Sequence, residues 1–133
     1  SELDNHFIFD YFSNKNIMVI ASSPKNDIEA EWRFIVADKK VITGSQYHKN
    51  NDIVIMNDFD SKAMEYAQMV VDEVAFSPDP AYTLDIAKTS DGKYHVVEIN
   101  SFSCSDPYAA NFEDYVREIS KLAKKEFEDL MTI

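Results

Sequence analysis

Glycine is scarce in this chain, and its scarcity excludes two kinds of nucleotide site. The 133 residues contain only two glycines, Gly44 and Gly92. A P-loop and a Rossmann fingerprint each need several glycines in one turn, because the backbone must approach the phosphates closely. If the chain handles a nucleotide, it therefore does so through another kind of site.

Cysteine and long apolar runs are also lacking. Cys104 is the single cysteine and cannot form an internal disulfide, which indicates a reducing compartment such as the cytoplasm. No apolar run approaches the roughly 20 residues that a membrane-spanning helix needs, so we expect no membrane partner. The three histidines, His6, His48 and His95, are scattered and lack the spacing of a zinc site.

Basic residues are few relative to acids. The chain has 13 lysines and arginines against 24 aspartates and glutamates, a formal net charge of −11. Nucleic-acid backbones are bound by basic surfaces, so we expect no nucleic-acid partner. A hydrophobic content of 45% is enough for a packed core without disulfides at this length. We therefore treat residues 1–133 as a single domain, with residues 1–16 as an N-terminal arm.

The stretch at residues 82–101 predicts a β-hairpin. Two segments rich in β-branched and aromatic residues flank Asp91-Gly92, a strong signal for a tight turn. With a two-residue loop, Asp85 lies opposite Glu98, and Asn100 lies on the same face of the hairpin. The sequence therefore predicts two carboxylates and an amide side by side.

Facing carboxylates repel each other and raise each other's proton affinity, unless a cation lies between them. Magnesium prefers hard oxygen ligands of this kind, so the hairpin face is a candidate magnesium site. The alternative is a solvated outer face with ordinary acids. The pairing also depends on the loop, because a three-residue loop with a glycine bulge would shift it.

Residues 30–47 predict a second hairpin, with Asp38-Lys39 at its turn. On this register Arg33 lies opposite Gly44, and Glu31 lies opposite Gln46. A glycine across from Arg33 would leave its guanidinium room to reach a ligand. The alternative is an exposed ion pair that contributes little to stability. The other face is expected to be buried, and it carries Trp32, Phe34, Val36, Val41 and Tyr47.

The remaining segments complete an α+β fold. Residues 17–21 predict a buried strand and residues 53–56 a minor strand, while residues 59–74 have the apolar spacing of a helix. A last helix, capped by Asn111, has the apolar stripe Phe112, Tyr115, Val116, Ile119, Leu122, Ala123, Phe127 and Leu130. We expect an antiparallel sheet of two hairpins plus a short strand, with two main helices packed on one face.

The two predicted hairpins resemble the C-terminal part of the ATP-grasp superfamily. The resemblance rests on EWRFIVADKKVITGSQY at 31–47 and on YTLDIAKTSDGKYHVVEINSFSCS at 82–105, and it extends over about residues 17–130. An aspartate strand followed by an E-x-N strand, together with an E-x-R hairpin, is the motif that carries it. The similarity is closest to uncharacterised ATP-grasp proteins of phages and bacteria.

The resemblance implies ATP and Mg²⁺ as cofactors. As metal ligands it implies Asp85, Glu98 and Asn100. Arg33 would contact the nucleotide phosphates and take part in catalysis. As further nucleotide-binding residues we expect Met18 and Ile20, near the adenine, and the upstream Lys25.

The chemistry of the superfamily makes an acyl-phosphate from a carboxylate and ATP, which an amine or a thiol then attacks. We therefore expect an ATP-dependent ligase, or part of one, whose carboxylate substrate the sequence does not identify. A complete ATP-grasp site also has a second lobe with a phosphate-binding lysine, so a separate chain supplying that lobe is a candidate partner. Two alternatives stay open, a catalytically inactive nucleotide-binding module and an acidic protein-interaction module without a ligand.

Overall fold

The computed structural model describes residues 21–132 except 22, 51 and 75–77. The arm expected at residues 1–16 and nearly all of the strand expected at 17–21 therefore lie outside the described residues. No helix in the described part of the chain is long and apolar enough to cross a membrane.

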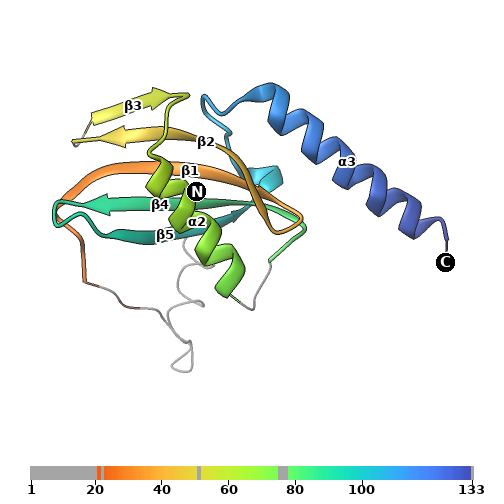
Figure 1. The fold of residues 1–133 in the computed structure, drawn as a ribbon, viewed down its shortest axis with the longest axis horizontal. Coiled ribbons are helices and arrows are strands. Elements are labelled where there is room, and N and C mark those ends of the chain that lie inside the picture. The colour runs from red at the N-terminus through yellow and green to blue at the C-terminus, as the bar shows by residue number, and fades with distance from the viewer. Residues whose placement is uncertain (1–20, 22, 51, 75–77, 133) are drawn as a thin grey trace, which may run out of the picture.

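Five antiparallel strands form one sheet in the order β3-β2-β1-β4-β5, with β1 and β4 at its centre (Figure 1). The strands are β1 (Ile28–Ala37), β2 (Lys40–Lys49), β3 (Asp52–Met56), β4 (Ala81–Thr89) and β5 (Tyr94–Ser101). The helices are α2 (Ser61–Glu73), the short 3-10 helix η1 (Phe102–Cys104) and α3 (Phe112–Leu130). The α+β class, the two hairpins and the minor strand at 53–56 are confirmed.

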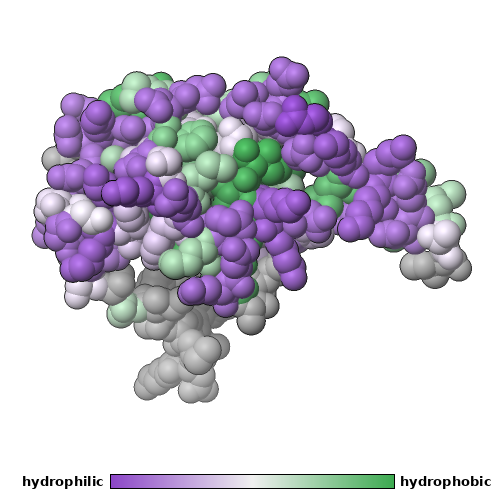
Figure 2. All heavy atoms as spheres, in the orientation of Figure 1, coloured by the Kyte–Doolittle hydropathy of each residue, from purple (hydrophilic) through white to green (hydrophobic). Residues whose placement is uncertain are grey.

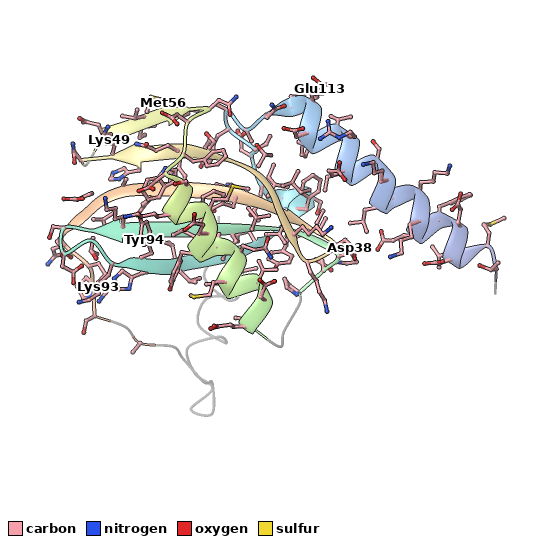
Figure 3. The ribbon with its side chains drawn as sticks, in the orientation of Figure 1. Asp38, Lys49, Met56, Lys93, Tyr94 and Glu113 are labelled. Carbon is pink, nitrogen blue, oxygen red and sulfur yellow. The ribbon has the colours of Figure 1, made fainter. Side chains whose placement is uncertain are left out.

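The turn between β1 and β2 lies where the sequence predicts it. Asp38 and Lys39 both have positive φ, at 46° and 64°. Two successive left-handed residues are typical of the type I′ turn, whose twist matches that of an antiparallel hairpin. Asp38 and the Lys93 turn of the other hairpin lie at opposite ends of the sheet (Figure 3).

The register of this hairpin differs from the expected one. An irregularity between Ile35 and Val36 lets β2 carry an extra residue, so Arg33 pairs with Ser45 and Phe34 pairs with Gly44. A second irregularity places Glu31 opposite His48 and not Gln46. The prediction that Gly44 makes room for Arg33 is therefore wrong.

Gly44 makes room for an aromatic ring instead. A Cβ atom at Gly44 would lie 2.5 Å from Cδ1 of Phe34, which is too close for any side chain. Phe34 itself is fully buried. The glycine thus belongs to the packing of the core.

The β4–β5 hairpin combines two irregularities that cancel. Its loop has three residues, because Thr89 N–H donates to Lys93 O at 3.0 Å and Gly92 adopts φ of 80°. A bulge between Asp85 and Ile86 then restores the pairing, and Asp85 lies opposite Glu98 as predicted.

One face of the sheet packs against α2 and forms the core. Trp32 and Phe34 are 4% and 0% exposed, which confirms that both are buried. The core joins alternate strand residues to small residues of α2: Ala30, Trp32, Phe34, Val36, Val41, Tyr82, Leu84 and Ile86 with Ala63, Ala67 and Val71. Tyr94 lies on the α2 side of β5, where its ring stacks on Tyr66 (Figure 3). Tyr47, expected on this face, lies on the other.

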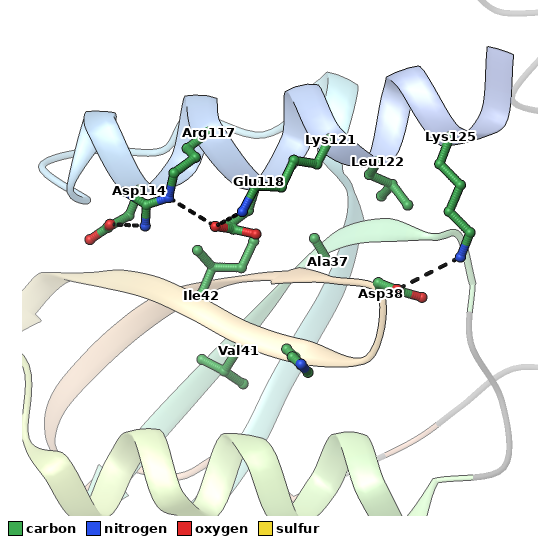
Figure 4. A pocket seen from close by; sticks show the side chains of 11 residues that line it. Ala37, Asp38, Val41, Ile42, Asp114, Arg117, Glu118, Lys121, Leu122 and Lys125 are labelled. Carbon is green, nitrogen blue, oxygen red and sulfur yellow. Dashed lines mark hydrogen bonds and ion pairs between the residues drawn. The ribbon is translucent and has the colours of Figure 1, made fainter. Parts of the chain in front are cut away.

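Helix α3 lies across the opposite face of the β1–β2 hairpin from α2 (Figure 4). The expected packing of both helices on one face therefore holds for α2 alone. Asn111 caps α3 as predicted, because its side chain accepts from the N–H groups of Glu113 and Asp114. Of the predicted apolar stripe only Leu122 is buried, and Phe112 and Phe127 are 71% and 63% exposed. Most of α3 extends beyond the sheet, which leaves the stripe uncovered by the described residues (Figure 1).

Candidate functional site

A buried ionic cluster lies on the face of the sheet opposite α2. Arg33 donates to both carboxylate oxygens of Asp85, from Nε at 2.8 Å and from Nη2 at 2.7 Å. Nη2 also donates to Oε1 of Glu98 at 3.2 Å. Arg33 is 9% exposed and Asp85 is 1% exposed, so this pair is almost out of contact with water.

The strand register brings these three side chains together. Arg33 on β1 pairs with Asp85 on β4, and Asp85 pairs with Glu98 on β5. Paired residues in a sheet point to the same face, so the three form a row across adjacent strands. The central position of β1 and β4 explains the burial of the first two, while β5 at the edge leaves the Glu98 side chain 49% exposed.

Electrostatics in the cluster follow from burial and proximity. The hydrogen bonds and charge of Asp85 raise the pKa of Arg33, so the guanidinium stays charged. Burial raises the pKa of Asp85, and the Glu98 carboxylate adds to this, while Arg33 opposes it. A bidentate arginine is thus what keeps a buried carboxylate ionised here.

The segment at residues 101–111 covers this cluster. Its Asp106 carbonyl accepts from Nη1 of Arg33 at 3.4 Å. The ring of Tyr108 lies 5.0 Å from the Arg33 guanidinium carbon, and Tyr47 on β2 lies 5.8 Å from it. The two tyrosine rings stack on each other at 5.2 Å. The guanidinium is therefore bounded by two aromatic rings as well as by two acids.

Hydroxyl groups of the sheet anchor the same segment. Ala109 N–H donates to Oγ of Ser45 at 3.2 Å, and Asn111 N–H donates to Oγ1 of Thr43 at 3.1 Å. Oγ1 of Thr83 donates to Oγ of Ser105 at 3.0 Å. The small polar residues on this face thus serve as attachment points for backbone that crosses the sheet.

The Tyr47 hydroxyl is held in its neutral form. Burial raises its pKa above the usual range, and the nearby carboxylates of Asp85 and Glu31 add to the effect, while Arg33 lowers it. Tyr47 is therefore a hydrogen-bonding and stacking group at neutral pH and not a base.

The residues fit a hard cation only in part. Both oxygens of Asp85 are engaged by Arg33, so this carboxylate is not open to an ion in the present arrangement. Glu98 and the partly buried Asn100 lie two residues apart on one face of β5 and offer carboxylate and amide oxygens, the donors magnesium uses. Among the described residues no group of three or more His, Cys, Asp or Glu side chains could hold a metal.

The other predicted site residues are not assembled around Arg33. Lys25 is exposed in the segment before β1, close in sequence to Asp27, which bonds to Ser90 in the β4–β5 loop. Met18 and Ile20 lie outside the described residues. The sequence analysis missed Tyr108, because an aromatic in a loop gives no periodic signal, and it placed Tyr47 on the wrong face.

A cavity of about 430 Å³ lies elsewhere, between the tip of the β1–β2 hairpin and α3 (Figure 4). Its floor is apolar, with Val41, Ile42 and Leu122, and hydrophobic atoms gather in this notch on an otherwise hydrophilic face (Figure 2). Its rim consists of ion pairs, among them Lys121 with Glu118 at 2.9 Å. None of the predicted site residues lines this cavity.

Comparison with known protein families identifies a match over most of the chain. Residues 9–119 match the ATP-grasp domain, in the third family of one clade of these domains. No curated protein and no solved structure matches the chain. The matched range includes both hairpins, the ionic cluster and the segment that covers it.

Proposed function

Because the chain belongs to this family of ATP-grasp domains, we propose that the Arg33 face of its sheet binds the phosphates of ATP. Membership confirms the resemblance of the two hairpins and gives the chain an ATP-binding, ligase-type function. The finer assignment of residues and chemistry is our proposal.

The observation that carries the proposal is the burial of Arg33 with Asp85 on the face opposite the core. A buried ion pair is a weak source of stability, because desolvation offsets much of the attraction. The α2 face already supplies an apolar core, so the fold does not require charge on the other face. A buried arginine held by a carboxylate at a fixed position is, however, a suitable partner for a phosphate.

We assign different roles to the three acidic and amide groups. Asp85 orients Arg33, since it engages both sides of the guanidinium fork. Glu98 and Asn100 would hold magnesium, because their oxygens lie together at the more exposed edge of the face. When bound, magnesium supplies charge neutralisation on the transferring phosphoryl oxygens.

The chain's own residues then position and neutralise the nucleotide. Arg33 stabilises negative charge on the phosphates, which favours formation of an acyl-phosphate from a bound carboxylate. The rings of Tyr47 and Tyr108 limit the access of water to this guanidinium. A second lobe from another chain or from further sequence would close the nucleotide from the opposite side, as the ATP-grasp resemblance implies. The carboxylate and the amine or thiol that react belong to classes we leave open.

The test is titration of the purified chain with a non-hydrolysable ATP analogue and magnesium, followed by calorimetry. We expect Glu98→Gln to weaken magnesium-dependent binding at least about tenfold, since it removes a charge and keeps the shape. Glu113→Gln, at an exposed acid in the first turn of α3, is the matched control and should bind like the unmodified chain. Equal affinity of the Glu98→Gln variant, or binding that ignores magnesium, would contradict the assignment.

A further inference from the structure

We propose that residues 101–111 form a lid that closes the Arg33 site in the free chain, and that a phosphate anion must displace this lid to bind. This inference rests on the proposed function, because it concerns access to the same arginine. It adds a conformational step that the ATP-binding assignment does not contain.

The hydrogen-bonding capacity of Arg33 is nearly filled. A guanidinium has five N–H groups, and four of them donate here, to Asp85 twice, to Glu98 and to the Asp106 carbonyl. A phosphate that bonds Arg33 in the usual two-pronged manner needs two N–H groups at once. At least one present partner must therefore leave.

The Asp106 carbonyl is the partner that can leave at least cost. Its bond of 3.4 Å is the longest of the four, and it accepts through an uncharged oxygen on an exposed residue. Asp85 is held by two short bonds and has no access to water. Release of Asp106 carries Tyr108 with it, since the Tyr108 N–H donates to the Asp106 carboxylate at 2.8 Å.

The lid is anchored by a few contacts and holds one unfavourable conformation. Its crossing backbone is tied to the sheet by the bonds of Ala109 to Ser45 and of Asn111 to Thr43. Tyr108 adopts φ of 53°, a left-handed conformation that residues with a side chain rarely occupy. Opening of the lid would relieve this conformation, so the closed state is one that a competing anion can replace.

Closure must lower the apparent affinity for any phosphate anion. When only a fraction of the molecules has the lid open, the apparent dissociation constant is the intrinsic constant divided by that fraction. Variants that loosen the lid without touching Arg33 should therefore bind an anion more tightly. This is the opposite of what the loss of a ligand-contacting residue would do.

Two variants loosen the lid at separate points. Thr43→Val removes the acceptor of the Asn111 N–H and keeps a β-branched shape, and Tyr108→Ala removes the ring from Arg33. With pyrophosphate and magnesium as the probe, we expect each to bind about three- to tenfold more tightly than the unmodified chain, in line with a larger open fraction. Adding Arg33→Met to Thr43→Val should abolish the gain. Phe112→Ala, at an exposed aromatic beside the lid, is the control and should leave the affinity unchanged.

Hydrogen exchange tests closure without reference to affinity. In the free chain the Ala109 and Asn111 amides should be protected, because both donate to buried side-chain oxygens. Pyrophosphate should accelerate their exchange in the unmodified chain and leave it unchanged in Arg33→Met.

The outcomes separate the two proposals. Unprotected amides, or an affinity that is unchanged or weaker in both Thr43→Val and Tyr108→Ala, would overturn the lid while anion binding itself survives. If no variant binds pyrophosphate although the amides are protected, the anion site fails, and the lid as its gate fails with it.

Discussion

The two faces of the β1–β4 ribbon differ sharply, although alternate residues of the same strands form both. Toward α2 the strands present Trp32, Phe34 and Leu84, which are nearly or fully buried against small helix residues. Toward the lid they present Arg33 and Asp85, which are as deeply buried but charged.

The comparison separates what stabilises the fold from what the fold positions. Burial of apolar surface stabilises the folded chain, whereas burial of a charge costs free energy unless a partner compensates for it. Each face therefore responds to substitution in its own way. The α2 face should be sensitive to lost volume and insensitive to pH, and the lid face should be sensitive to lost partners and to protonation.

The largest expected effect is on the α2 face. Phe34→Ala should lower the free energy of unfolding by about 3–5 kcal/mol, because Phe34 is fully buried and its removal leaves a cavity. Urea denaturation measures this loss. Phe127→Ala, at an aromatic that is 63% exposed on α3, should change stability by less than about 0.5 kcal/mol. Equal losses in the two variants would mean that the α2 face is not the core.

The next effect breaks the ion pair on the lid face. Arg33→Met should destabilise the chain by about 3 kcal/mol at neutral pH, because it leaves the Asp85 charge buried without its partner. Arg33→Met combined with Asp85→Leu should recover most of this loss, since no charge then remains in that place. Failure of the double variant to recover would show that packing of the arginine, and not its charge, matters.

The Arg33→Met loss should depend on pH. Burial raises the pKa of Asp85, and without Arg33 nothing at this position opposes the shift. A carboxyl whose folded pKa exceeds its unfolded pKa destabilises the fold as pH rises through the folded value. The loss should therefore be smaller near pH 4 than at pH 7, each measured against the unmodified chain at the same pH. A loss that is the same at both pH values would contradict the buried, uncompensated carboxylate.

A smaller effect is expected where β5 meets α2. The Tyr94 hydroxyl donates to Asp60 at 2.8 Å, and the other Asp60 oxygen accepts from Lys62 N–H at the start of α2. Burial and this bond raise the pKa of Tyr94 to about 12. Tyr94→Phe should cost about 1 kcal/mol, a typical value for one hydrogen bond. In thermal unfolding, Tyr115→Phe on α3 serves as the comparison, and an equal shift for both would remove the Asp60 bond as the cause.

Local signals in the sequence predicted the elements and part of the site. The Asp38-Lys39 and Asp91-Gly92 turns, the Asn111 cap and the pairing of Asp85 with Glu98 all depend on residues close in sequence. The last of these is correct because a three-residue loop and a bulge offset each other. Bulges have no fixed sequence signature, which is why the partner of Arg33 was displaced by one residue.

Contacts between distant segments could not be predicted in the same way. Tyr108 reaches Arg33 only because residues 101–111 fold back over the sheet, and nothing in the local pattern sets that path. The stripe of α3 has the period of a buried helix, yet most of it extends past the sheet. A pattern shows which side of a helix is apolar, but the tertiary structure decides whether that side is covered.

One nuclear magnetic resonance titration tests the contrast between the faces most directly. The Arg33 Nε–H, bonded to Asp85, reports on the lid face, and the indole N–H of Trp32, the single tryptophan, reports on the α2 face. On addition of a non-hydrolysable ATP analogue with magnesium, we predict that the Arg33 signal shifts in a saturable manner while the Trp32 signal stays in place. A saturable shift of Trp32 with an unmoved Arg33 signal would contradict the account.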